Sequence, residues 1–229
     1  MKGLTLIMNA DNWMTELTDK LKAHFKNRLL FAGLQGSYRR QEAHEDSDID
    51  AVVILDAVSM NDLIAYRKIL ATMPQNDKAC GFIGGRQELL NWPKYELFQF
   101  KQDTLPYYGA LDTLLPNTER KDIIDSVKIS ASGLYHACCH AAVHTPLDID
   151  AIKGMYKSPF FLLQALCYLR SGIYICTKKE LLPLLEGAER EILTININWN
   201  AYSSTIMANT DIYFDLMFRW SKEILNADF

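Results

Sequence analysis

The sequence predicts an α/β (α+β) domain built on a small mixed β-sheet with helices, followed by an α-helical bundle domain. Before residues 103–116, short apolar runs typical of strands alternate with helical segments; after them, nearly every segment carries apolar residues at helical spacing. Pro106 and Gly109 interrupt regular structure in that stretch, so we expect two domains, residues 1–108 and 109–229. A chain of 229 residues is long enough for each domain to bury its own core.

The first domain is expected to open with a helix over residues 11–26. Its apolar side chains recur every four residues and share one face, at Trp13, Leu17, Leu21 and Phe25. A second helix is expected from an N-cap at Ser59 to about Met73, before Pro74.

Four strands are expected in this domain, each a short apolar or alternating run: residues 29–34, 51–55, 79–83 and 95–101. The second is continuously apolar, as expected of a buried strand. In the fourth, YELFQFK, alternation places Glu96 on the same face as Phe98 and Phe100.

Helices are expected throughout the second domain, where apolar residues recur at helical spacing, near residues 119–144, 148–154, 158–172, 178–194 and 198–226. The sequence contains no internal repeat and no low-complexity tract. The second domain is therefore predicted to be a helical bundle.

Composition narrows the class of protein. The formal charge is -4 and no basic stripe is visible, so no nucleic-acid partner is expected. No stretch approaches the ~20 apolar residues of a membrane span, and we identify no secretory signal, so no membrane partner is expected. The five cysteines are irregularly spaced, which favours free thiols and a cytoplasmic location. Nothing in the sequence indicates an oligomeric state.

One constellation of residues points to phosphate chemistry. Gly36-Ser37 is followed, after ten residues, by the D-x-D pair Asp48 and Asp50 and an apolar run. Gly36 permits a tight turn, and Ser37 offers a hydroxyl and an N–H to phosphate oxygens. On a strand, residues two apart point to the same face, and two carboxylates there repel unless a cation lies between them. Hard oxygen ligands beside a nucleoside triphosphate favour Mg²⁺.

Each half of this constellation has a less specific interpretation. A D-x-D pair alone is usually a solvated turn or a helix cap, and a Gly-Ser pair alone is usually a loop. Here an apolar strand precedes the first half and another follows the second, and this combination favours a binding site.

The spacing of the two halves resembles the polymerase β-like nucleotidyltransferase superfamily. The resemblance implies transfer of a nucleoside monophosphate from an NTP, with Mg²⁺ bound by Asp48 and Asp50. Members of the superfamily carry a third carboxylate on a later strand of the same sheet, and Glu96 falls where it is expected, as general base or third metal ligand. The alternative for Glu96 is a surface acid at a strand end, and Asp103 is its nearest competitor.

Residues 162–185 form a second point of resemblance. They suggest a helix, a Ser-Gly turn, a Thr-Lys-Lys sequence and another helix, similar to the C-terminal domain of aminoglycoside adenylyltransferases of the streptomycin and spectinomycin type. In that group this domain supplies an Arg and a Lys to the triphosphate, which implies Lys178 or Lys179 here. Gln164 occupies the position of the Arg, and Arg170 lies about two turns further on. The alternative for the two lysines is a surface pair near a helix cap.

Further candidates lie close to the phosphate turn. Arg39 and Arg40 follow it directly, and one of them is expected to contact the triphosphate. Ser47, directly before Asp48, is also a nucleotide-binding candidate. His44 lies in the same loop, where a solvated side chain is the favoured interpretation.

Three histidines in the second half form a stripe on a predicted helix, at His136, His140 and His144. Such a stripe can bind zinc, but a partly buried polar face is favoured, because three ligands on a straight helix rarely converge. Asp112 and Asp211 are candidates to meet a cationic amine of an acceptor.

The expected activity follows from these resemblances. ATP with Mg²⁺ is expected to bind between the nucleotidyltransferase catalytic domain and the bundle, with Ser37 and the Gly36 turn holding the β and γ phosphates. AMP would pass in line to a hydroxyl of a small-molecule acceptor, for which an aminoglycoside is the candidate, with release of pyrophosphate. The alternatives are a non-catalytic, antitoxin-like regulatory protein on the same fold, and an enzyme that adenylylates a protein.

Overall fold

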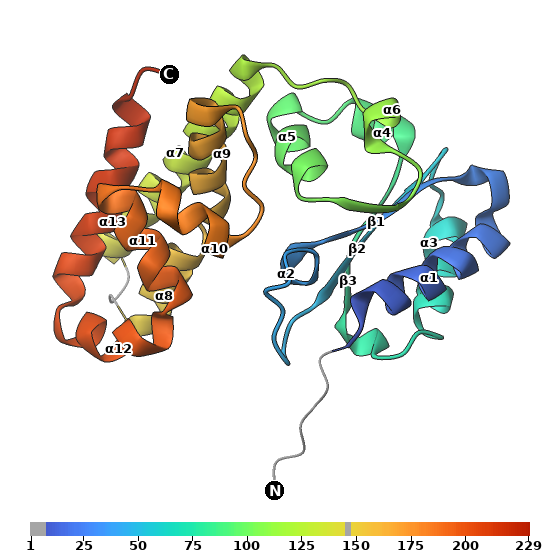
Figure 1. The fold of residues 1–229 in the computed structure, drawn as a ribbon, viewed down its shortest axis with the longest axis horizontal. Coiled ribbons are helices and arrows are strands. Elements are labelled where there is room, and N and C mark those ends of the chain that lie inside the picture. Colours follow the sequence, from blue (N-terminus) through green and yellow to red (C-terminus); the bar gives the residue numbers. More distant parts are fainter. Residues whose placement is uncertain (1–7, 145–147) are drawn as a thin grey trace, which may run out of the picture. The chain divides into compact units, whose positions relative to one another are not determined.

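The computed structural model describes residues 8–144 and 148–229, and the chain divides into two compact units, Met1–Asn117 and Thr118–Phe229 (Figure 1). The division falls later than the expected boundary after residue 108. The reason is helix α6 (Leu111–Leu114): Leu111 and Leu115 are buried in the core of the first unit.

The first unit contains the expected small mixed sheet, in the order β3-β2-β1-β4. The strands are β1 (Leu29–Gln35), β2 (Ile49–Leu55), β3 (Ala79–Gly85) and β4 (Leu105–Tyr108). β1 pairs antiparallel with both β2 and β4, and β2 pairs parallel with β3. The predictions for the first three strands are confirmed, whereas the sequence did not predict β4.

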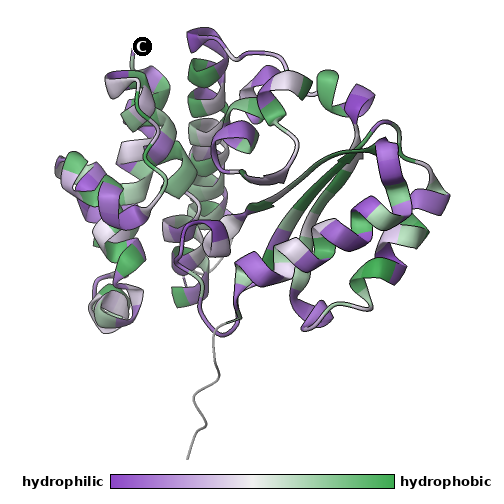
Figure 2. Ribbon diagram, turned by 45° about the vertical axis from the view of Figure 1, so that its right-hand side comes forward, coloured by the Kyte–Doolittle hydropathy of each residue, from purple (hydrophilic) through white to green (hydrophobic). Residues whose placement is uncertain are grey.

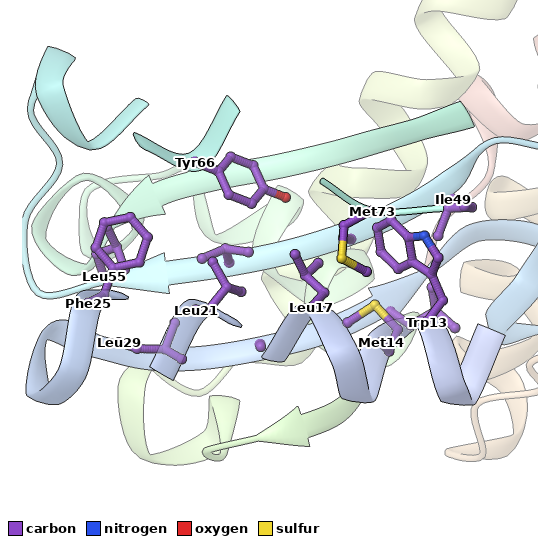
Figure 3. Packing of buried hydrophobic residues seen from close by; sticks show 14 of the residues in the cluster. Trp13, Met14, Leu17, Leu21, Phe25, Leu29, Ile49, Leu55, Tyr66 and Met73 are labelled. Atoms are coloured by element: carbon purple, nitrogen blue, oxygen red, sulfur yellow. The ribbon is translucent and has the colours of Figure 1, made fainter. Parts of the chain in front are cut away.

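The central strands are hydrophobic along most of their length (Figure 2), because both faces of the sheet are covered. Helices α1 (Ala10–Phe25) and α3 (Met60–Leu70) cover one face. Leu17 and Leu21 of α1 point toward the sheet (Figure 3), as the four-residue spacing predicted. On β2, alternation sends Val53 into this core and Val52 into the other.

The opposite face is covered by α4 (Arg86–Leu90), α5 (Lys94–Gln102) and α6. The predicted strand 95–101 is therefore wrong, since these residues form α5. Pro93 stands at its N-cap, and Leu97 and Phe100, three apart, bury a shared helical face. The alternating side chains of YELFQFK suggested a strand, although the three-residue spacing of Leu97 and Phe100 is that of a helix.

The second unit is helical, as predicted. Its helices are α7 (Arg120–His144), α8 (Ile149–Lys157), α9 (Phe160–Ser171), α10 (Lys178–Leu181), α11 (Gly187–Ile197), α12 (Trp199–Ala208) and α13 (Thr210–Asn226). Single 3-10 turns occur at Lys26–Arg28, Asn76–Lys78 and Leu182–Leu184. Within residues 8–144 and 148–229, no helix is long and apolar enough to cross a membrane.

Lys128 of α7 caps the last helix of this unit. Its ammonium donates hydrogen bonds to the carbonyl oxygens of Ile224 (3.1 Å), Leu225 (2.7 Å) and Ala227 (2.6 Å). These carbonyls belong to the last turn of α13 or follow it, where most carbonyl oxygens lack an N–H donor within the helix and a cation is favoured. One side chain thereby fixes the end of α13 to α7.

Candidate active site

The candidate site lies where β1 ends and β2 begins. The short helix α2 (Gly36–Arg39) follows β1 directly, and the register of the two strands sets Gln35 opposite Asp50. Gly36 adopts φ of +72°, and a Cβ at this position would lie 1.9 Å from Asp50 Oδ2. Glycine is therefore required here both by the backbone conformation and by the carboxylate beside it.

Asp50 lies in β2 on the same side as Val52 and Ile54, which is the α5 face of the sheet. Asp48 precedes the strand and is exposed, whereas Asp50 is half-buried. Burial raises the pKa of the Asp50 carboxyl, and the charge of Asp48 raises it further. The fold thus gathers negative charge that it does not fully neutralise, which is the condition under which a cation binds.

The third carboxylate at this edge of the sheet is Asp103, directly after α5. The residue is 5% exposed, and its Oδ2 accepts hydrogen bonds from Arg40 Nη1 (2.8 Å) and from the Gly36 N–H (3.4 Å). Its Oδ1 is buried and accepts no hydrogen bond from any described residue. Burial raises the pKa of Asp103 although Arg40 lowers it, and the Asp103 charge in turn raises the pKa of Asp50.

Glu96 lies elsewhere. It is exposed in the first turn of α5, and seven residues at ~1.5 Å each separate it from Asp103 by about 10 Å along the helix axis. The structure therefore brings Asp103, the competitor named from the sequence, toward Asp50 and leaves Glu96 on the surface. Pro93 is the sequence signal that could have predicted this arrangement of Glu96 and Asp103. Proline favours the start of a helix, and a helix that starts there has Glu96 in its first turn and Asp103 at its C-terminal end.

The two arginines after the turn have different surroundings. The Arg40 side chain is 10% exposed and pairs with Asp103 and with Glu42 (3.3 Å), so it acts as an internal counter-ion. Arg39 is half-buried and lines a cavity of about 380 Å³ together with Tyr38 and Tyr107. That Arg39 contacts the triphosphate stays a prediction.

The loop between the turn and the carboxylates is closed by its own residues. Ser47 is buried, its hydroxyl accepts a hydrogen bond from the His44 N–H (2.9 Å), and its N–H donates to the His44 carbonyl (3.0 Å). The exposed His44 ring accepts from the Asp46 N–H through Nδ1 (3.3 Å). Ser47 thus shapes the turn that delivers Asp48.

In the second unit, Lys178 and Lys179 open α10. The Lys178 ammonium lies 5.5 Å from the centroid of the Phe160 ring, and Lys179 is exposed. Arg170 forms a two-point ion pair with Glu189, at 2.7 and 2.5 Å, so its guanidinium is already engaged.

Gln164 holds the loop that leads to these lysines. It is fully buried, and its amide nitrogen donates to the carbonyls of Ile175 (2.8 Å) and Cys176 (3.0 Å). Its amide oxygen accepts from the Tyr174 hydroxyl (3.1 Å). At the position where the resemblance implied an Arg, this chain has a structural clamp.

Gln164→Leu is expected to lower the stability of the protein by about 1–3 kcal/mol, because two loop carbonyls lose their donor while the apolar volume is kept. Thermal unfolding measures the effect. Gln87→Leu, at an exposed position of α4, is the matched control and should leave the melting temperature almost unchanged. Equal melting temperatures for the two variants would contradict a clamp at Gln164.

Two further candidates were predicted to meet a cationic amine of an acceptor. Asp112 lies in α6 of the first unit, not in the bundle, and pairs with Lys101 (2.8 Å). Asp211 is exposed in the first turn of α13. In the part of the chain that the structure describes, no group of three or more His, Cys, Asp or Glu side chains is arranged to hold a metal ion.

Comparison with known proteins gives a family match for most of the first unit and a fold match for the chain. Residues 14–101 match the nucleotidyltransferase domain family, a segment that spans the Gly36 turn and both aspartates. Among solved structures, the chain is similar to the spectinomycin adenyltransferase AAD(9) from Enterococcus faecialis, crystallised with ATP and spectinomycin. The TM-score is 0.58 and the identity 15%, over 96% of this chain and 100% of that one, which establishes a shared fold. A search of curated proteins finds no match.

Proposed function

We propose that the chain transfers AMP from ATP to a hydroxyl of a small-molecule acceptor of the aminoglycoside class and releases pyrophosphate. Residues 14–101 match the nucleotidyltransferase domain family, and the chain shares its fold with an adenyltransferase. The observation that carries the proposal is that Asp50 and Asp103 both lie against the Gly36 turn, where the charges of Asp48 and Asp103 raise the pKa of Asp50. The structural relative crystallised with ATP and spectinomycin supports both substrates.

The residues present fit Mg²⁺. Magnesium that accompanies a nucleotide takes one or two carboxylates from the protein and further oxygens from the phosphates, so Asp48 and Asp50 suffice without a third ligand. The raised pKa of Asp50 beside Asp48 indicates charge that a cation would neutralise. When bound, the ion would offset the negative charge of the phosphates and of the departing pyrophosphate.

The chain's own groups would perform the remaining tasks. The Gly36 turn and Ser37 would bind the β and γ phosphates, with Arg39, Ser47, Lys178 and Lys179 as further proposed nucleotide-binding residues. Asp103 would take the proton of the acceptor hydroxyl as it attacks the α-phosphorus, while the P–O bond to pyrophosphate breaks. We assign this role to Asp103 in place of Glu96 because Asp103 is the carboxylate held beside Asp50. The five cysteines, all free thiols, fit a cytoplasmic enzyme.

The assignment of the base predicts opposite outcomes for two variants. Asp103→Asn is expected to lower kcat by about 10²–10⁴-fold, the usual contribution of a general base, and Glu96→Gln to leave it close to that of wild type. Steady-state kinetics across pH measures both, because loss of the base also removes the acidic limb of the kcat profile. The reverse result, a silent Asp103→Asn and an inactive Glu96→Gln, would return the role to Glu96.

The function itself is tested by label transfer. The full chain is incubated with Mg²⁺, a panel of aminoglycosides, and ATP labelled with ³²P at either the α or the γ position. The proposal expects label on an aminoglycoside from α-labelled ATP alone, because the γ label leaves with pyrophosphate. Label on protein would support protein adenylylation instead, and absence of any transfer with the whole panel would support the regulatory alternative.

A further inference from the structure

The C-terminal half of α7 carries three exposed histidines on one face, at His136, His140 and His144. The ring centroids of His136 and His140 lie 6.2 Å apart, and those of His140 and His144 lie 5.1 Å apart. Within the described part of the chain, none of these imidazoles forms a hydrogen bond or an ion pair with another residue. Their ring nitrogens are therefore available to an external ligand.

The helix limits how many of them can share one ion. Eight residues separate the outer histidines, which places them about 12 Å apart along the axis. They cannot converge on one centre, in agreement with the lack of a three-residue metal group among the described residues. Neighbours four apart remain, and these share a face.

The spacing of one neighbouring pair matches chelation. Zinc binds histidine nitrogen at about 2.0–2.1 Å in a tetrahedral arrangement, which sets the centroids of two coordinating imidazoles about 5 Å apart. His140 and His144 already stand at 5.1 Å. His136 and His140, at 6.2 Å, would need rotation of their side chains to coordinate together.

We propose that His140 and His144 form a two-point site for a divalent transition-metal ion, with Zn²⁺, Ni²⁺ and Cu²⁺ as its chemical class. Imidazole nitrogen favours these ions, whereas Mg²⁺ prefers oxygen. The site belongs to the second unit and differs in donor chemistry from Asp48 and Asp50, so it stands independently of the proposed transfer reaction. Water or a donor from a ligand would complete the coordination.

Calorimetric titration of the tag-free full chain with ZnCl₂ tests the site, with MgCl₂ in excess to occupy the carboxylates. Wild type is expected to bind one ion. His140→Ala and His144→Ala should each weaken binding at least about tenfold, since loss of groups that only support a ligand already costs 10–100-fold. His24→Ala, at an exposed histidine of α1 remote in sequence, is the matched control and should bind like wild type.

Two results would overturn the proposal: no zinc binding by wild type, or binding by His140→Ala as tight as that of wild type. A larger loss for His136→Ala than for His144→Ala would contradict the assignment of the pair. AMP transfer is expected to be unchanged in His140→Ala, which separates the outcome here from that of the proposed function.

Discussion

Asp50→Asn is expected to abolish AMP transfer and, at neutral pH, to raise the melting temperature of the protein without metal. Loss of the carboxylate would remove a proposed Mg²⁺ ligand, and an ion that stabilises phosphate charge by several kcal/mol corresponds to at least about 100-fold in rate. The stability effect has the opposite sign. Burial and the charge of Asp48 raise the pKa of Asp50 above its value in the unfolded chain, so the ionised group destabilises the fold once the pH exceeds that unfolded value.

The neutral amide removes this penalty at little cost, because the Asp50 carboxylate forms no hydrogen bond with a described residue. Thermal unfolding with and without Mg²⁺, beside the label-transfer assay, measures both effects. Mg²⁺ should raise the melting temperature of wild type and not that of the variant, because a ligand of the folded state stabilises only where it binds. Asp46→Asn, at an exposed aspartate in the same loop, is the control and should match wild type. An Asp50→Asn enzyme with wild-type turnover would refute the proposed site.

Gly36→Ala is expected to lose both activity and stability. The left-handed conformation at φ of +72° costs an L residue about 1–2 kcal/mol. The new Cβ would in addition meet Asp50 Oδ2 at 1.9 Å, so either the turn or the carboxylate must move. Displacement of either one separates the phosphate turn from the proposed metal ligand.

Gly172→Ala isolates the backbone contribution. Gly172, the C-cap of α9, has φ of +71°, and a Cβ added there would meet no atom within 4 Å. The substitution should lower the melting temperature through backbone strain alone and leave transfer intact, whereas Gly36→Ala should melt lower still and be inactive. If the two variants show equal melting temperatures and equal turnover, the contact between Gly36 and Asp50 has no functional importance.

The elements that local periodicity encodes could be predicted from the sequence. α1 and the helices of the second unit follow helical spacings of apolar residues, and the first three strands are short, largely apolar runs. Gly36 and Asp50 could be found for the same reason, since Gly36 directly follows β1 and Asp50 lies at the start of β2. Their roles in binding and catalysis stay predictions.

What could not be predicted depends on long-range pairing. β4 has four residues, LPYY, without a periodic signal, and it exists because β1 offers it an antiparallel edge. That pairing carries Asp103 to Gly36. The choice between helix and strand for residues 95–101 depends on the same arrangement, because a helix is needed to cover the second face of the sheet. The expectation that Glu96 shares a strand face with Phe98 and Phe100 was wrong for the same reason.

The close contact between Gly36 and Asp50 also limits which substitutions can accumulate at these two positions during evolution. The Asp50 carboxylate occupies the space that a Cβ at position 36 would need. A conservative change at position 50 therefore cannot rescue a substitution at position 36. Loss of the charge at position 50, in contrast, is expected to leave the fold intact and to remove the repulsion from Asp48. If selection for activity ceased, substitutions of Asp50 would therefore be expected before substitutions of Gly36. The resulting inactive proteins would be more stable and would keep the glycine.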